Sequence, residues 1–109
     1  MSTITTKTPI IITLLVKRKP NLHFNEHHLL TVHVPLVAKH WGPHGLVERT
    51  ATRVVDETSE YAYAITMKWE SEESWESAKN DEEGMAAVLG DVAGVTDGEL
   101  VFVVGRVIA

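Results

Sequence analysis

Six histidines gather in one stretch of the sequence, between His23 and His44, and the chain contains no cysteine. The missing thiol excludes disulfides, cysteine nucleophiles and cysteine-ligated zinc or iron–sulfur sites. Histidine titrates closer to neutral pH than other side chains, so it can accept and return a proton at modest cost. Acid–base chemistry by histidine is therefore the first hypothesis for this stretch.

His33 is the histidine whose spacing most favours a catalytic role. It lies three residues after Leu30 and four before Val37, which places all three on one helical face, with the imidazole toward the apolar interior. At that place His33 could act as a general base. The alternative is a core histidine that hydrogen-bonds a backbone carbonyl.

A glycine–proline loop follows, with His40, Trp41 and His44 around it. Loops on a rigid scaffold often carry function, and a tryptophan beside two histidines could line a pocket that stacks a flat substrate. We take His44 as a second catalytic candidate, and His40 and Trp41 as substrate-binding candidates. The alternative is a surface loop in which Trp41 fills the edge of the core.

The group of His23, His27 and His28 suggests a metal site, because His23 and His27 have the i, i+4 spacing of paired ligands. Glu26 is the one carboxylate close to them in sequence, and His23 precedes the expected helix. We favour a solvated or dimer-contacting group instead and keep His28 as a substrate-binding candidate. We expect neither a metal nor an organic cofactor.

Large and small residues alternate along the segment 61–69, with Tyr63 and Trp69 on the face opposite the alanines. This alternation could shape a cavity in which Tyr63 donates a proton to, or orients, a substrate oxygen, and Trp69 contacts the substrate. The alternative is cross-strand packing. Arg53 could bind a carboxylate through two guanidinium nitrogens, or could face water.

The composition is that of one ordinary globular domain. The chain has 109 residues, of which 44% are hydrophobic, and a net charge of −5. This negative balance argues against nonspecific binding to nucleic acid or to an anionic membrane surface. The apolar run 9–16 is too short to span a bilayer. We expect a cytoplasmic protein with a flexible tail at 1–8 and a single domain at 9–109.

Hydrophobic patterning and chain breakers predict the order strand, helix, strand, strand, helix, strand. The predicted elements are a strand at 9–17, a helix at 25–33 ending before Pro35, strands at 49–55 and 61–69, a helix from Ser71 or Ser74 with a second short piece to Leu89, and a strand at 99–108 with a glycine bulge. This order is the ferredoxin-like βαββαβ arrangement, an α+β fold with both helices on one sheet face. The strands are apolar on both faces, so the uncovered face should pair with a second subunit as a homodimer.

Two segments carry a family resemblance. The first strand ends in KRKP (17–20), and the first helix closes in HVPL (33–36). Together they resemble the EthD-domain family of the dimeric α+β barrel superfamily, and the order of elements extends the resemblance over 9–108. The resemblance implies a ferredoxin-like chain that pairs sheet to sheet, with the family's histidine at His33. Relatives usually carry an aromatic residue near position 27, where this chain has His27 and His28.

The activities implied by the resemblance vary. The family includes dehydratases and decarboxylases of aromatic polyketide pathways, and the superfamily includes cyclases, lactone isomerases and monooxygenases. Our first hypothesis is a cofactor-independent lyase or isomerase that acts on an aromatic or polyketide-like substrate, with His33 as general base. The second is a non-catalytic accessory protein that binds a small molecule, and the third is a cofactor-free monooxygenase.

Overall fold

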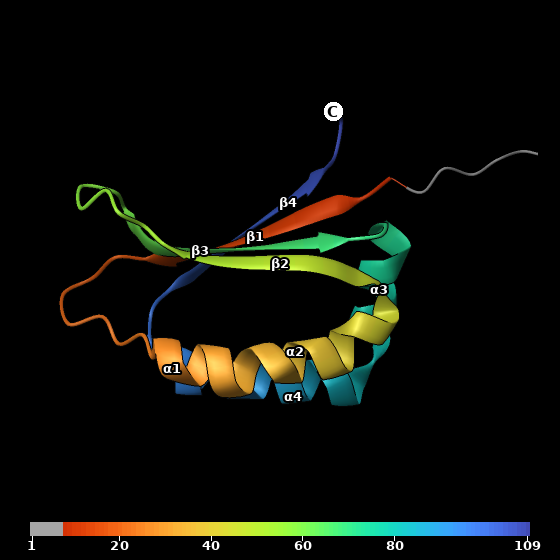
Figure 1. The fold of residues 1–109 in the computed structure, drawn as a ribbon, viewed down its shortest axis with the longest axis horizontal. Helices are drawn as coiled ribbons and strands as arrows, with labels where there is room; N and C mark the ends of the chain where they lie inside the picture. Colours follow the sequence, from red (N-terminus) through yellow and green to blue (C-terminus); the bar gives the residue numbers. More distant parts are fainter. Residues whose placement is uncertain (1–7) are drawn as a thin grey trace, which may run out of the picture.

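Four antiparallel strands form one sheet, and helices cover one of its faces (Figure 1). The computed structural model describes residues 8–109, so most of the predicted tail at 1–8 lies outside the described residues. The elements in chain order are β1 (Ile10–Lys17), α1 (Glu26–His28), a π-helical turn η1 (Leu29–His33), α2 (Val34–Trp41), a short 3₁₀ turn η2 (Gly42–His44), β2 (Leu46–Arg53), β3 (Tyr61–Trp69), α3 (Glu72–Asn80), α4 (Glu82–Val95) and β4 (Leu100–Arg106). The strand order β2-β3-β1-β4 is that of the ferredoxin-like fold and confirms the predicted architecture.

The sheet is built around β1, which pairs with β3 on one side and β4 on the other. The strand predicted at 61–69 is confirmed, whereas β2 begins at Leu46 rather than at position 49, because its ladder with β3 already starts opposite Trp69. The prediction of a glycine bulge in the last strand was wrong. The register between β4 and β1 runs unbroken through Gly105.

The first helical segment continues beyond Pro35, so the prediction that it ends before this proline was wrong. The backbone N–H of Val34 bonds the carbonyl of Leu29, five residues back, which is the π-helical pattern. Pro35 is then the second residue of α2, in a first turn where a missing N–H is tolerated. The wider π turn thus lets the chain resume an α-helix at a residue that normally ends one.

The second helical region is also longer than predicted. Ser71 caps α3 as expected, but α4 runs on through Gly90 and Gly94 to Val95, although the glycines predicted an earlier end. Packing against α2 and η1 compensates for the low helix propensity of glycine. In the part of the chain that the structure describes, no helix is long and apolar enough to cross a membrane.

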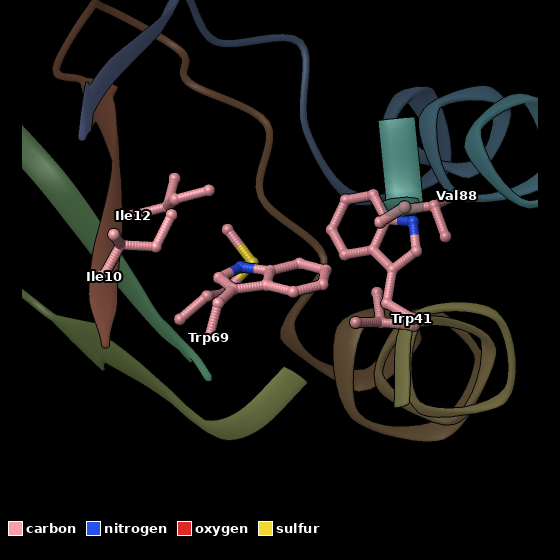
Figure 2. Packing of buried hydrophobic residues seen from close by; sticks show 8 residues of the cluster. Ile10, Ile12, Trp41, Trp69 and Val88 are labelled. Atoms are coloured by element: carbon pink, nitrogen blue, oxygen red, sulfur yellow. The ribbon is translucent and has the colours of Figure 1, made fainter. Parts of the chain in front are cut away.

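The core lies between the sheet and the helical layer. Ile10 and Ile12 of β1 pack with Trp69 of β3, and Trp41 and Val88 approach from α2 and α4 (Figure 2). Figure 1 shows α1, α2 and α4 beneath the sheet and α3 at one end of it. The two layers thereby enclose the region where the candidate site lies.

Candidate functional site

Two histidines of the first helical segment hydrogen-bond one carboxylate of α4. His33 Nδ1 lies 2.9 Å from Asp91 Oδ2, while His28 Nε2 lies 2.9 Å from Oδ1 and 3.0 Å from Oδ2. The exposed fraction is 14% for the side chain of His33, 19% for Asp91 and 26% for His28. We call these three residues the Asp91 cluster. It ties the first helical segment to α4.

The charge on Asp91 fixes where the protons of this cluster lie. Burial raises the pKa of Asp91, but hydrogen bonds and charge from His28 and His33 act in the opposite direction and hold its pKa below the usual value. An ionised carboxylate only accepts hydrogen bonds, so both imidazoles donate to it. His33 therefore carries a proton on Nδ1, and in the neutral ring Nε2 is an acceptor. No described residue hydrogen-bonds this Nε2.

An apolar cavity of about 110 Å³ lies between the sheet and the helices, with His33 on its wall. All four strands, η1, α2 and α4 contribute to the lining, mostly with aliphatic side chains. The lining residues that carry a polar side-chain atom besides His33 are Trp41, Arg49 and Thr96. An imidazole on the wall of an apolar cavity, with one nitrogen held by a carboxylate and the other without a partner among the described residues, is an arrangement suited to a general base.

The helical segment before α2 sets the direction of His33. Asn25 Oδ1 accepts the backbone N–H of His28 at 2.9 Å and caps the first turn. The π turn then shifts the inward face, so that Leu29 is buried at 7% exposure whereas Leu30 is 65% exposed. The prediction that His33 shares a face with Leu30 was therefore wrong. His33 shares the cavity wall with Leu29 and Val37 instead.

A glycine of α4 makes room for His28. A Cβ atom on Gly94 would lie 2.7 Å from His28 Nε2, closer than real Cβ contacts come. The bare backbone lets this imidazole cross to Asp91, one turn earlier on the same helix. His28 itself does not line the cavity, and the structure places this predicted substrate-binding residue against Asp91 instead.

His44 lies at the far end of α2 in a second group of polar residues. Its Nε2 lies 3.0 Å from Asp81 Oδ2, and its Nδ1 lies 2.7 Å from Ser77 Oγ. We call His44, Asp81 and Ser77 the Asp81 cluster. It borders an open surface hollow lined by glutamates of α3, away from the apolar cavity. His40 also lies on this side, since its Cβ contacts the position a side chain on Gly84 would take.

Tyr63 and Arg53 join a different polar contact. The Tyr63 hydroxyl donates to Glu26 Oε2 at 2.7 Å, and Arg53 donates to both carboxylate oxygens of Glu26. Arg53 thus binds a carboxylate through two nitrogens, as the sequence suggested, but the carboxylate belongs to the protein. Hydrogen bonds from Arg53 and Tyr63 lower the pKa of Glu26. Neither Tyr63 nor Arg53 lines the cavity.

The two tryptophans predicted to bind substrate have different surroundings. Trp41 lines the cavity, whereas Trp69 is fully buried and packs behind it with ring centroids 5.6 Å apart. Figure 2 shows the Trp69 ring extending from the sheet toward Trp41. The indole nitrogens of both residues are buried, and neither has a hydrogen-bond partner among the described residues.

Asp91 is the functional candidate that the sequence prediction missed. A signal was present, because Asp91 is the one charged residue in the otherwise apolar stretch 84–96. An isolated carboxylate on an apolar helix needs a partner, and the histidine-rich segment offers several. Within residues 8–109, no group of three or more histidine, aspartate or glutamate side chains is placed to hold a metal ion.

Comparisons with known proteins find similar structures but no similar sequences. No protein-family model and no curated protein matches the chain. An EthD-like protein from Ralstonia eutropha matches with a TM-score of 0.80 at 18% identity, over 94% of this chain and 95% of that one. An EthD family protein from Bacillus halodurans matches with 0.62 at 22% identity, over 93% and 99% of the two chains. SnoaB, a cofactor-independent oxygenase from Streptomyces nogalater, matches with 0.60 at 13% identity, over 94% and 96%.

The chain has the fold of the EthD-like proteins. The resemblance predicted from the KRKP and HVPL segments is thereby confirmed at the level of structure, across nearly the whole chain. Other matches are described as dimeric ferredoxin-like proteins, one of them from Thermobifida fusca. At these sequence identities the matches show the fold alone, so the activity has to be argued from the site.

Proposed function

We propose that this protein is a cofactor-independent lyase or isomerase of the dehydratase, cyclase or decarboxylase type, which moves a proton on a small aromatic or polyketide-like substrate. The observation that carries the proposal is His33. Its Nδ1 is held by an ionised aspartate, its Nε2 has no partner among the described residues, and it lines an apolar cavity. These three features suit a general base.

The proposed reaction begins when His33 Nε2 removes a proton from a carbon next to a carbonyl group. The electron pair of the C–H bond moves to the carbonyl oxygen and forms an enolate, while His33 becomes an imidazolium. The Asp91 carboxylate, 2.9 Å away, stabilises that positive charge. The imidazolium then returns its proton to another substrate atom or to a leaving hydroxyl, which accounts for isomerisation or dehydration without a cofactor.

The indole N–H of Trp41 is a hydrogen-bond donor that a substrate could use, and this supports the proposal. The Trp41 side chain is 5% exposed and its indole N–H has no acceptor among the described residues, although a buried unpaired donor costs about 1–3 kcal/mol. Figure 2 shows this nitrogen beside Val88, another residue of the cavity wall. A substrate oxygen is a suitable acceptor, and negative charge developing on that oxygen would strengthen the bond.

Proton exchange tests the proposal before the natural substrate is known. Single-ring ketones with acidic C–H bonds, phenylpyruvate among them, are incubated in D2O and loss of the C–H signal is followed by proton NMR. We expect exchange that requires the intact protein and falls to the buffer rate in His33→Gln. Equal exchange by both proteins would contradict the proposal.

The same experiment separates the alternative functions. A non-catalytic accessory protein would bind these compounds without accelerating exchange. A cofactor-independent oxygenase, the activity printed for the match from Streptomyces nogalater, would consume oxygen after the same deprotonation, which an oxygen electrode detects. The lyase or isomerase that we propose accelerates exchange with no oxygen uptake.

We further propose that the chain works as a homodimer. In the described part of the chain, residues 8–109, no helix covers the second face of the sheet (Figure 1). Alternation along β1 and β4 places Ile11, Leu15 and Val103 on this face. Matching structures described as dimeric support the same assembly. Sedimentation should give twice the protomer mass of 12.1 kDa at micromolar concentration. Leu15→Glu should yield a folded monomer by circular dichroism, whereas a wild-type mass of one protomer would contradict the dimer.

A further inference from the structure

Among the described residues that line the apolar cavity, Arg49 is the one with a permanent charge. It lies on β2, opposite Met67 of β3, and alternation along the strand turns it toward the helical layer. Its neighbours on the cavity wall include Ala51 and Ile65, and Arg49 itself is exposed to solvent. The charge therefore borders a space that is otherwise suited to an uncharged molecule.

The four arginines of the chain differ in their partners. Arg53 binds Glu26, Arg106 binds Glu72, and Arg18 donates to three backbone carbonyls. Arg49 makes no hydrogen bond or ion pair with any residue in the range 8–109. Arg53 lies four residues away on the same face of β2, so the strand and face that carry the two side chains do not explain why only Arg53 has a partner.

A guanidinium group at the rim of an apolar cavity recognises a carboxylate, which it can bind through two parallel hydrogen bonds. The size of the cavity limits the rest of the ligand. Its volume of about 110 Å³ is below the range of about 300–1,000 Å³ typical of drug-sized sites, and close to that of engineered cavities that hold one benzene ring.

We infer that the cavity binds a single-ring carboxylate, with the ring in the apolar space beside His33 and the carboxylate on Arg49. The inference extends the proposed function and rests on it, because the choice of site comes from that proposal. It assigns a substrate class and a specificity-determining residue. Phenylpyruvate and similar aryl-substituted keto acids carry both the anion and the acidic C–H bond, so they suit the cavity and the base together.

Calorimetric titration with benzoate and benzamide tests the inference, because the two molecules have nearly the same shape and differ in charge. We expect wild-type protein to bind benzoate about 10- to 100-fold more tightly than benzamide, the range expected for hydrogen bonds to a charged group. Arg49→Gln should remove this preference and leave benzamide binding unchanged. Arg53→Gln, on the same face of the same strand, should retain it.

Equal affinity of the wild-type protein for the two ligands, or no binding of either at millimolar concentration, would overturn the inference. So would an Arg49→Gln variant, folded by circular dichroism, that still prefers benzoate. Exchange of phenylpyruvate in D2O is measured on the same proteins. A benzoate preference without exchange contradicts the proposed reaction but not the Arg49 site, whereas exchange without the preference contradicts the Arg49 site alone.

Discussion

The molecule contains two histidine–aspartate clusters with nearly the same contact distances. In the Asp91 cluster His33 lies 2.9 Å from the carboxylate, and in the Asp81 cluster His44 lies 3.0 Å from it. Both carboxylates have a lowered pKa: hydrogen bonding is the main cause in Asp81, and in Asp91 it outweighs the opposing effect of burial. The hydrogen bond between imidazole and carboxylate therefore does not distinguish the two sites.

The two clusters differ in what the second imidazole nitrogen does. His44 uses both nitrogens within the protein, because Ser77 and Asp81 occupy one each. Asp81 also caps α4 by accepting the backbone N–H of Gly84, which gives this cluster a structural task. His33 lines the apolar cavity, and its Nε2 has no partner within residues 8–109. This nitrogen and the cavity, rather than the ion pair, make the Asp91 cluster the better candidate for chemistry.

The largest expected effect comes from replacing His33 and His44, one histidine from each cluster. His33→Ala should fold as a dimer yet lose roughly 10²- to 10⁴-fold in turnover, the usual contribution of a general base. His33→Gln should be nearly as poor, because glutamine cannot take up a proton near neutral pH. His44→Gln should stay within about threefold of the wild type, since both of its nitrogens already have partners.

The measurement is turnover together with the thermal midpoint for each variant. If His33 were only structural, the alanine variant would lose stability and the glutamine variant would keep its activity. A His44→Gln variant that is as inactive as His33→Gln would restore the catalytic role predicted for His44 from the sequence.

The fold was largely predictable because strand signals are local. Tyr61–Trp69 has strand-forming residues between clear turn signals, and its ends in the structure are those predicted. The errors fall where tertiary packing overrides a local preference. The π turn carries the helix past Pro35, and contacts with α2 hold α4 helical through its glycines. Neither event leaves a periodic signal that the sequence alone could show.

The candidate site was half predictable. His33 could be selected from the histidine-rich stretch, but the residue that orients it lies 58 positions away on α4. Spacing arguments apply within one element and cannot pair two elements whose separation is set by the fold. Arg49 was missed for a related reason, because Arg53 has the same local context on β2 and only the structure shows which one lacks a partner.

Changing the two aspartates should have the second largest effect. Asp91→Asn should lower turnover roughly 10- to 100-fold, since His33 remains but loses the anion that fixes its tautomer and stabilises the imidazolium. Asp81→Asn should leave turnover unchanged and cost little stability, because asparagine is also a good N-cap residue. Equal loss of activity in both variants would remove the distinction between the clusters.

Acid unfolding gives a separate check on the Asp91→Asn variant. A carboxylate whose pKa is lowered in the folded state stabilises that state above its unfolded pKa, about 4, and this contribution disappears as the pH falls through the folded pKa. The difference in free energy of unfolding between wild type and Asp91→Asn should therefore be constant near neutral pH and shrink below about pH 4. Denaturant titrations at several pH values measure it. A difference that grows on acidification would mean that the pKa shift has the opposite sign.

The smallest expected effect comes from substitutions at two glycines of α4, each of which lies beside one of the two clusters. A Cβ on Gly94 would lie 2.7 Å from His28 Nε2, and a Cβ on Gly84 would lie 2.6 Å from Asp81 Oδ2, so each substitution pushes on one cluster. Gly94→Ala should lower turnover roughly three- to tenfold, because His28 supports Asp91 without touching the substrate. This loss is smaller than the roughly 10²-fold loss in rate that a misplaced reacting group can cause. Gly84→Ala should lower only the thermal midpoint.

Gly90→Ala is the matched control, because it lies on the same helix with nothing within 4 Å of the added methyl group. It should raise the free energy of unfolding by about 0.5–1 kcal/mol, the difference in helix propensity between the two residues, and leave turnover alone. Turnover and thermal midpoint for the three variants then separate the clusters. If Gly94→Ala matched Gly90→Ala in both measurements, His28 would have no part in holding Asp91, and His33 and Asp91 would form the site by themselves.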